Sequence, residues 1–415
     1  MAIALQRRPG LAHLARGLFA ALALMAGAGC EDRSAPATGG PGVAPAANTD
    51  AGGAGPAPTS DAAPIKVGHY ASMTGKEATF GQSTDRGIRL AIKEINAAGG
   101  LNGRQLEVIT YDTKGESKEA GNAVTRLITS DKVTAVLGEV ASGLSLAGGA
   151  VAQQYGVPMI SPSSTNPKVT LGRDMVFRVC FIDPFQGFVV AKFARENLKA
   201  GKAAVLFDQA QPYSKGLRDE FIKHFQAMGG TIVADEAFSS GDQDFSAQLN
   251  TIRAAGPEVI FVPGYYTEAG NIAQQARKLG ITVPLMGGDG WDSEQLAAIG
   301  QDAIEGCYYS NHYAPDQPSE EVRTFVSKYQ SEYGQTPDGL AALGYDAAKV
   351  LFEAMKHAPS LEGKALAAAV AQTKDHRGVT GIITIDQNRD ATKSAVVVQM
   401  KGGKPVWVAT VEPPK

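Results

Sequence analysis

Two turns rich in hydroxyl groups and glycine are the parts of this sequence best suited to bind a small anion. The turn at residues 138–145 contains Ser142, the turn at 161–167 contains Ser163 and Thr165, and each follows a short apolar run. A serine at the start of a helix places its hydroxyl beside free backbone N–H groups and the positive end of the helix dipole, which all favour an anion. Because neighbouring parallel strands end at the same edge of a sheet, we expect both turns to converge on a carboxylate site. The alternative is that Ser142 only caps its own helix.

An acidic residue between two glycines, Asp289, is the candidate for binding an ammonium group. It lies in the segment 286–291, which follows a short apolar run and ends in a tryptophan. A Gly-Asp-Gly sequence also favours an Asx turn without any ligand, and this alternative stays open. Tyr265 and Tyr266 follow another predicted strand, and they either line a cleft or pack at a lobe surface.

The sequence gives little indication of catalysis. The six histidines show no spacing typical of a metal site, and the three cysteines form no CxxC motif. Ser145 is not in a nucleophile elbow, because Ala147 stands where the second glycine of that motif is needed. We therefore expect a protein that is not an enzyme and has no metal ion or other cofactor.

The first 63 residues read as targeting and tethering segments. Arg7, Arg8 and Arg16 precede a short apolar run, which is typical of a signal peptide, here residues 1–29. Cys30 follows small residues and is a candidate for lipidation, although an ordinary cleavage after Ala28 is the alternative. Residues 30–63 are dominated by Ala, Gly and Pro and predict a disordered linker. We expect a protein of the periplasm or cell envelope that is tied to the membrane only by a lipid anchor.

The rest of the chain alternates short apolar runs with amphipathic segments, and after Asp183 this alternation starts again. Alternation of this kind predicts an α/β fold of two doubly wound lobes, each built on a mostly parallel sheet, joined by a multi-strand hinge. The expected lobes are residues 64–182 with 311–381, and residues 183–310 with 382–415. Cys180 and Cys307 could pair or remain free thiols. The net charge of −3 argues against nucleic acid as a partner.

Across residues 65–408 the sequence resembles the branched-chain amino acid binding proteins, the leucine-type periplasmic receptors of ABC transporters with the type I fold. The segments that carry the resemblance are 67–68, 73–75, 96–103, 138–145, 161–167, 213–216, 242–245 and 286–290. The resemblance implies that Ser142 and Thr165 bind a ligand carboxylate, that Ser163 contributes a carbonyl, and that Asp289 binds the ammonium group. Asp289 replaces the glutamate that is usual in this family. The cleft tyrosines correspond to Tyr213 and Tyr265, and an aromatic residue near the first loop corresponds to Phe80.

The side chain of the ligand is left open by the sequence. Residues that could shape several different pockets are Phe80, Glu139, Val140, Tyr213 and Trp291. If Glu139 points into the cleft it favours polar or cationic ligand side chains, and if it points to solvent it has no bearing on the ligand.

The expected function is capture of an amino acid similar to leucine, isoleucine or valine by closure of two lobes, and delivery to an ABC permease in the inner membrane. The alternatives are an amide, a urea-like solute, an aromatic acid or a γ-amino acid bound by the same fold, or a sensory ligand-binding module.

Overall fold

The computed structural model describes residues 63–414. The predicted signal peptide, Cys30 and all of the linker except Ala63 lie outside the described residues. Within residues 63–414, no helix combines the length and the apolar character that a membrane span requires.

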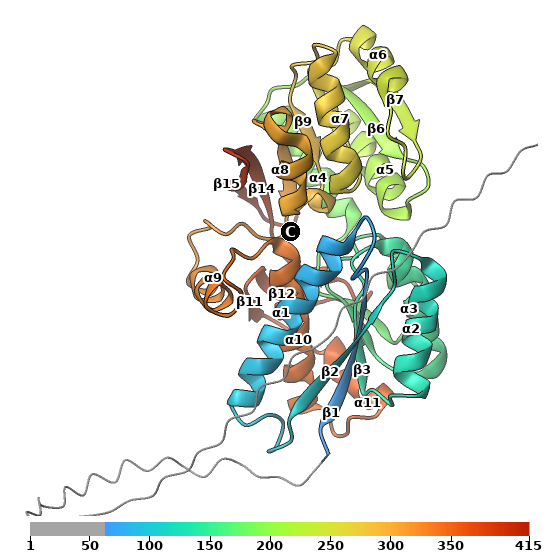
Figure 1. The fold of residues 1–415 in the computed structure, drawn as a ribbon, viewed down its shortest axis with the longest axis vertical. Helices are drawn as coiled ribbons and strands as arrows, with labels where there is room; N and C mark the ends of the chain where they lie inside the picture. The colour runs from blue at the N-terminus through green and yellow to red at the C-terminus, as the bar shows by residue number, and fades with distance from the viewer. Residues whose placement is uncertain (1–62, 415) are drawn as a thin grey trace, which may run out of the picture. The chain divides into compact units, whose positions relative to one another are not determined.

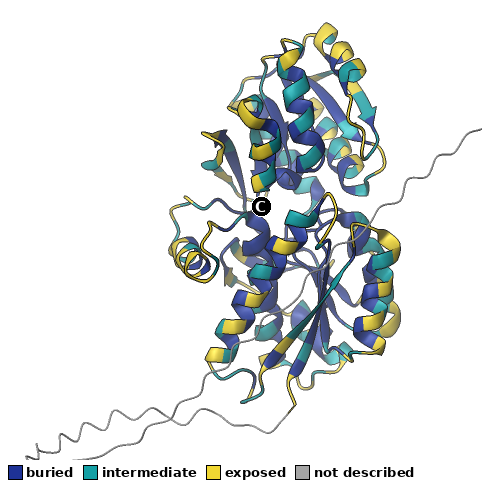
Figure 2. Cartoon of the chain, in the orientation of Figure 1, coloured by how far each residue is buried: buried dark blue, intermediate teal, exposed yellow. Residues whose placement is uncertain are grey.

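The first lobe is built on five parallel strands in the order β2–β1–β3–β4–β5 (Figure 1). Its strands are β1 (Ile65–Ala71), β2 (Leu106–Asp112), β3 (Ala135–Leu137), β4 (Met159–Ser161) and β5 (Val176–Arg178). Its helices are α1 (Ala78–Ala97), α2 (Ser117–Thr129), α3 (Ser142–Tyr155), α9 (Glu320–Tyr333), α10 (Gly339–His357) and α11 (Gly363–Ala371). Because helices cover both faces of the sheet, nearly all residues of the interior strand β1 are buried (Figure 2).

The second lobe is built on seven strands in the order β15–β14–β10–β9–β8–β6–β7. Its strands are β6 (Lys202–Asp208), β7 (Thr231–Phe238), β8 (Val259–Phe261), β9 (Leu285–Gly287), β10 (Tyr308–Asn311), β14 (Ala395–Lys401) and β15 (Lys404–Val411). Its helices are α4 (Asp183–Glu196), α5 (Pro212–Ala227), α6 (Ser246–Ala255), α7 (Tyr266–Lys278) and α8 (Glu294–Gly300). The strands β6 to β10 are parallel, whereas β14 and β15 pair antiparallel at one edge.

The chain passes between the lobes at three places. It leaves the first sheet after β5, returns to the first lobe after β10, and enters the second sheet again at β14. These crossings form a hinge of several strands, so the predicted fold class of two α/β lobes joined by such a hinge is confirmed. Three short 3-10 helices complete the described elements: η1 (Pro167–Val169), η2 (Asp289–Trp291) and η3 (Gln301–Ile304).

Residues 382–392, which we assigned to the second lobe from sequence, do not join its sheet. Strands β11 (His376–Gly378), β12 (Gly381–Ile385) and β13 (Ala391–Thr392) form a separate antiparallel sheet. Asp390, just before β13, accepts a hydrogen bond from Thr170 of the first lobe (2.7 Å). A β-rich tail in the sequence does not reveal which of its strands join an existing sheet and which form a separate one.

Helices α1 and α10 lie side by side and pack closely at Gly344. A Cβ on Gly344 would lie 2.5 Å from the carbonyl oxygen of Thr84, so only glycine permits this approach. The close packing fixes the N-terminal ends of both helices, and those ends carry Phe80 and Leu340.

The two cysteines in the described region, Cys180 and Cys307, are buried and unpaired. Burial raises the pKa of the Cys180 thiol to about 12, so this thiol stays protonated at neutral pH.

Arg178, on β5, is fully buried and holds the turn that follows β4. Its Nε atom lies 2.7 Å from Asp390 Oδ1, and its guanidinium donates to the carbonyls of Ser164 and Asn166 and to the hydroxyl of Thr170. The buried Arg178–Asp390 ion pair therefore holds the Ser163–Thr165 turn in place through hydrogen bonds from Arg178.

We predict that Arg178→Met lowers the free energy of unfolding by about 3–5 kcal/mol, because it leaves the buried Asp390 carboxylate without its cation. Chemical denaturation measures the change. Lys192→Met, which breaks the exposed Lys192–Glu196 pair, is the control and should cost less than about 1 kcal/mol. A loss below about 1 kcal/mol for Arg178→Met would contradict the structural role of this pair.

Candidate functional site

The two hydroxyl-rich turns lie against each other at the edge of the first sheet. Helix α3 begins at Ser142, and the residue that precedes it, Ala141, occupies the N-cap position. The Ser142 hydroxyl accepts a hydrogen bond from the backbone N–H of Asn166 in the second turn (3.3 Å). Ser142 therefore does not cap its own helix; its hydroxyl joins the two turns.

The Asp289 carboxylate is buried and is held by side chains from three other elements. Gln186 Nε2 on α4 donates to Oδ1 (2.8 Å), and the Tyr213 hydroxyl on α5 donates to the same oxygen (3.0 Å). His312 Nε2, just after β10, lies 3.1 Å from Oδ2. The hydrogen bonds of this carboxylate run to other elements and not to its own turn, so the Asx-turn alternative is wrong.

A small cavity lies between these two groups. Its non-atom space, including the part open to solvent, is about 250 Å³, and it is lined by Phe80, Val140, Ser142, Ser163, Tyr213, Tyr265, Asp289, Gly290 and Leu340. Seven of the eight predicted ligand-binding residues are in this set. The first lobe contributes the two serines and the second lobe contributes Asp289 and both tyrosines, so the cavity exists only where the lobes meet.

Two hydroxyls at the cavity have no hydrogen-bond partner among the described residues. Ser163 Oγ and the Tyr265 hydroxyl are buried and unpaired. Burial raises the pKa of Tyr265 well above its usual value, so its hydroxyl remains a donor at neutral pH. Because leaving buried polar groups unpaired is unfavourable, both hydroxyls are available to a polar ligand.

Aromatic rings form one wall of the cavity. The rings of Tyr213 and Tyr265 are stacked with centroids 5.4 Å apart, and Phe80 meets Tyr265 edge to face, also at 5.4 Å. Gly288, next to Asp289, must be glycine because a Cβ there would overlap the Tyr213 hydroxyl and lie 2.9 Å from Gln186 Nε2. This explains why a glycine precedes the acid.

Thr165 is the predicted binding residue that does not line the cavity. Its backbone carbonyl accepts a hydrogen bond from Asp183 N (2.9 Å), and its side chain lies beside the buried Asp183 carboxyl. Burial raises the pKa of Asp183 to about 8, and the Thr165 hydroxyl acts in the opposite direction. The Thr165 side chain thus faces the first crossing between the lobes, which leads from β5 to α4.

Glu139 and Trp291, which we considered as pocket residues from sequence, contact other parts of the protein. Glu139 accepts hydrogen bonds from the backbone N–H groups of Ser72 (2.7 Å) and Ala141 (2.8 Å), so it points neither into the cavity nor to solvent. Trp291 is fully buried within the second lobe and donates to the Val262 carbonyl (3.0 Å). Both side chains therefore stabilise the fold of their own lobe and do not line the cavity.

Sequence reasoning missed three residues of the site: Gln186, His312 and Leu340. Gln186 and His312 contact Asp289 from positions 103 and 23 residues away in the chain, and Leu340 comes from the start of α10. No local motif marks them, because their role arises only from the way the chain crosses between the lobes.

The lobes also contact each other directly outside the cavity. Lys76 Nζ lies 3.3 Å from Glu268 Oε1, the Tyr266 hydroxyl donates to the Lys76 carbonyl (2.6 Å), and Thr79 lies within hydrogen-bond distance of Ser293 (2.9 Å). Tyr266 therefore bridges the lobes, whereas its neighbour Tyr265 lines the cavity. These contacts are those of a closed arrangement.

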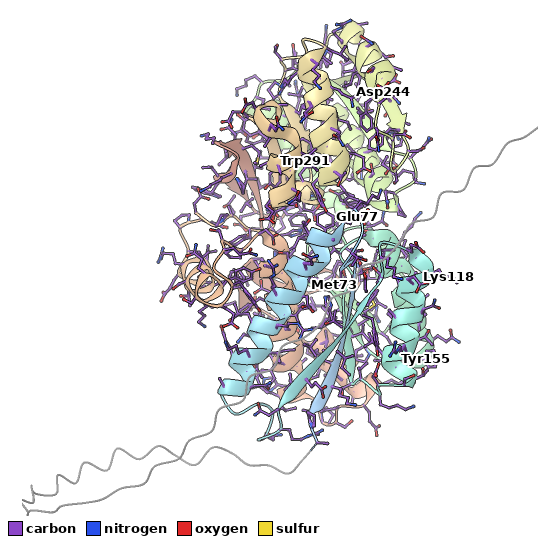
Figure 3. All side chains as sticks on the ribbon, viewed as in Figure 1. Met73, Glu77, Lys118, Tyr155, Asp244 and Trp291 are labelled. Carbon is purple, nitrogen blue, oxygen red and sulfur yellow. The ribbon has the colours of Figure 1, made fainter. Side chains whose placement is uncertain are left out.

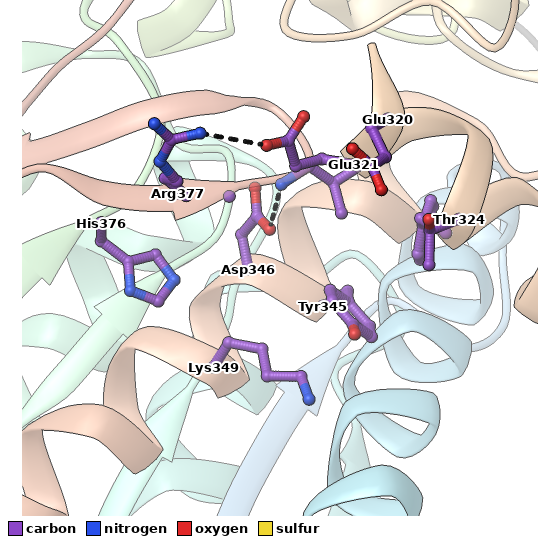
Figure 4. Close-up of a pocket in the computed structure, with 11 residues that line it drawn as sticks. Glu320, Glu321, Thr324, Tyr345, Asp346, Lys349, His376 and Arg377 are labelled. Carbon is purple, nitrogen blue, oxygen red and sulfur yellow. Dashed lines mark hydrogen bonds and ion pairs between the residues drawn. The ribbon is translucent and has the colours of Figure 1, made fainter.

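A second hollow, between α9, α10 and β11, contains none of the predicted site residues (Figure 4). Several of its charged groups are already engaged: Asp346 accepts from Val379 N (2.8 Å) and Thr380 N (2.9 Å), and Arg377 lies 3.7 Å from Glu321. Its polar groups stabilise the turn between β11 and β12, so the cavity between the lobes is the better candidate for a ligand site.

Comparison with known proteins agrees with the fold. The family described as periplasmic binding protein matches residues 64–404. The Leu/Ile/Val-binding protein homolog 2 of Brucella abortus (strain 2308) is 33% identical over 338 residues, which are 81% of this chain and 90% of the relative. This chain is a periplasmic binding protein of the branched-chain amino acid type.

Solved structures of this family align over most of the periplasmic binding protein described here. The leucine-binding protein LivK of Thermotoga maritima is 42% identical with a TM-score of 0.81, and the match covers 84% of this chain and 99% of LivK. LivJ of Streptococcus pneumoniae in complex with isoleucine is 37% identical with a TM-score of 0.80, covering 84% of this chain and all of LivJ. A solute-binding protein of Rhodopseudomonas palustris in complex with benzoate is 25% identical with a TM-score of 0.77. The match covers 84% of this chain and 97% of that protein.

Glu77 is a buried acid that lies where the lobes meet (Figure 3). Lys76 is 3.9 Å away. Burial raises the pKa of Glu77 to about 7; Lys76 lowers it, and Glu139, Glu268 and Asp208 raise it further. Folding therefore favours the protonated carboxyl, and the stability that this group contributes falls as pH rises from about 4.5 to about 7.

We predict that Glu77→Gln stabilises the protein at pH 8 by up to about 3 kcal/mol and has little effect at pH 4.5, where the native carboxyl is already protonated. Urea unfolding of both proteins at the two pH values measures the difference. A stabilisation of the same size at both pH values would contradict the raised pKa.

Proposed function

We propose that this protein is the extracytoplasmic solute-binding component of an ABC importer and that it binds a neutral aliphatic amino acid similar to leucine, isoleucine or valine. The single observation that carries the proposal is the cavity between the lobes, with a buried carboxylate on one side and serine hydroxyls on the other. An amino acid carries the two complementary groups, an ammonium and a carboxylate, on one carbon atom.

The ligand carboxylate would bind at the first lobe. Ser142 and Ser163 present hydroxyls to the cavity, and the N-terminus of α3 adds the positive end of a helix dipole. Ser163 Oγ has no partner within residues 63–414, so it can donate to the ligand without losing another hydrogen bond. The Thr165 hydroxyl is also buried without a hydrogen-bond partner among the described residues, but Thr165 does not line the cavity.

The ligand ammonium would bind Asp289. A carboxylate accepts about four hydrogen bonds, and Gln186, Tyr213 and His312 account for three, which leaves room for one more donor. A single N–H of an ammonium group fits this remaining position, whereas a guanidinium, which binds a carboxylate through two parallel hydrogen bonds, does not. This favours the α-amino group of a neutral amino acid.

The ligand side chain would pack against apolar groups. Phe80, Val140 and Leu340 line the cavity from the first lobe, and the Tyr265 ring lies against Phe80. No second charged side chain lines this cavity, so aliphatic side chains fit better than charged ones. The isoleucine complex of the similar LivJ structure supports the same ligand class.

An aromatic acid is the second candidate, because the benzoate-binding protein of Rhodopseudomonas palustris has a similar fold. Such a ligand has a carboxylate but no cation. It would leave the buried Asp289 charge uncompensated, which is strongly unfavourable. The retained acid at this position therefore favours an amino acid over an aromatic acid.

Closure would convert ligand binding into a signal for the transporter. A ligand that contacts both lobes stabilises the closed arrangement over the open one. We propose an inner-membrane ABC permease as the partner that reads the closed form, and a lipid on Cys30 as the membrane anchor. Relatives that belong to this family are binding proteins, and an enzymatic role is not part of the proposal.

We predict that isothermal titration of the purified protein gives binding of leucine, isoleucine or valine and no binding of benzoate. Asp289→Asn should lower the affinity by a hundredfold or more, because it removes the charge that pairs with the ammonium group while retaining the shape. Asp244→Asn, at an exposed residue of the second lobe, is the control and should bind as the wild type does. Equal affinity of wild type and Asp289→Asn, or binding of benzoate alone, would contradict the proposed ligand class.

A further inference from the structure

The buried charge of Asp289 has only neutral hydrogen-bond donors around it. Gln186 donates through an amide, which carries no charge. Tyr213 donates through a phenol, and burial raises the pKa of Tyr213 well above its usual value, so this group also remains uncharged. Among residues 63–414, His312 is the only basic side chain within 4.0 Å of the carboxylate. A protonated His312 would cancel the negative charge of Asp289, whereas a neutral His312 would leave that charge for a ligand.

His312 is held in place by the hinge. Its imidazole is fully buried and stacks on the ring of Phe181, with centroids 3.7 Å apart and an angle of 23° between the planes. Phe181 belongs to the first crossing between the lobes and His312 to the second. The ring orientation is thus fixed by two hinge segments and not by the loop that carries Asp289.

The surroundings of His312 favour a neutral ring. Nε2 faces Asp289, and Nδ1 is buried without a partner, so a proton added at Nδ1 would be a buried unpaired donor. Burial lowers the pKa of His312 to about 4, while Asp289 raises it and Lys393 lowers it. In the neutral ring the proton sits on Nε2 and is donated to Asp289 Oδ2.

We propose that His312 is the positioning residue of the ammonium site: as a neutral donor on the hinge, it orients the Asp289 carboxylate toward the cavity without cancelling its charge. The proposal rests on the proposed function, because it assumes that Asp289 receives the ligand ammonium. His312 itself does not contact the ligand; it acts through Asp289.

The groups that face His312 and Asp289 come from every neighbouring segment. Lys393, before β14, is buried and donates to the Thr380 hydroxyl, and burial lowers its pKa to about 8. Asp183 and Gln186 lie on α4, and the protonated Cys180 thiol lies on the first crossing. None of these groups takes the position of His312 as donor to Oδ2.

The test uses two substitutions that differ in one property. His312→Gln keeps an N–H donor and cannot be charged near neutral pH, whereas His312→Phe keeps a ring that stacks on Phe181 and removes the donor. With leucine as the probe at pH 7, we expect His312→Phe to weaken binding tenfold to a hundredfold, since a hydrogen bond to a charged acceptor is lost. His312→Gln should restore the affinity to within about threefold of the wild type.

A matched control separates this effect from general damage to a buried histidine. His69 is also fully buried, in the first lobe, where its Nδ1 bonds the Leu137 carbonyl (3.0 Å), and His69→Gln should lower the melting temperature without changing leucine affinity. In the wild type, nitrogen-15 NMR of the His312 ring should show a neutral imidazole with its proton on Nε2 at pH 6. That signature does not depend on the folding of any variant.

The outcomes distinguish this inference from the proposed function. Wild-type affinity for leucine in Asp289→Asn would overturn the ammonium site itself. If Asp289→Asn loses binding but His312→Phe binds as the wild type does, or His312→Gln binds as weakly as His312→Phe, the positioning role is wrong and the proposed function stands. A protonated His312 ring at pH 6 would also overturn the positioning role.

Discussion

The binding site depends on one constraint: the Asp289 carboxylate has been removed from water without a cation beside it. A buried charge is stable only when it is hydrogen-bonded and compensated. The protein supplies the hydrogen bonds through Gln186, Tyr213 and His312, all neutral. In the proposed function the ligand supplies the compensating positive charge, which favours an amino acid over a simple acid.

The arrangement of the two lobes follows from this constraint. Gly288 allows Tyr213 and Gln186 to approach the acid, and the hinge brings His312 to its other oxygen. The first lobe contributes the hydroxyls of Ser142 and Ser163, which lie across the cavity from Asp289. Neither lobe has a complete site, so a ligand with two opposite charges gains most when the lobes are closed. In the proposed function, this is the physical basis for coupling between binding and closure.

Much of the fold and part of the site were predictable from the sequence. The alternation of strands and helices predicted two α/β lobes, and motifs that follow strand ends, such as those of Ser142 and Asp289, were found because their position along the chain is local information. Thr165 does not line the cavity because its side chain lies beside Asp183, a position that no motif encodes. His312 and Leu340 were missed for the same reason, since they reach the site only through the crossings of the chain.

The most direct test of the ammonium site is a crystal structure of the protein with leucine bound. We expect the leucine nitrogen within about 3 Å of an Asp289 oxygen, and the leucine carboxylate at the hydroxyls of Ser142 and Ser163. The same structure should show His312 Nε2 still within hydrogen-bond distance of Oδ2. Leucine bound in the opposite orientation, or bound outside the cavity with Asp289 free of any cation, would contradict the central claim that the ligand supplies the charge that Asp289 lacks.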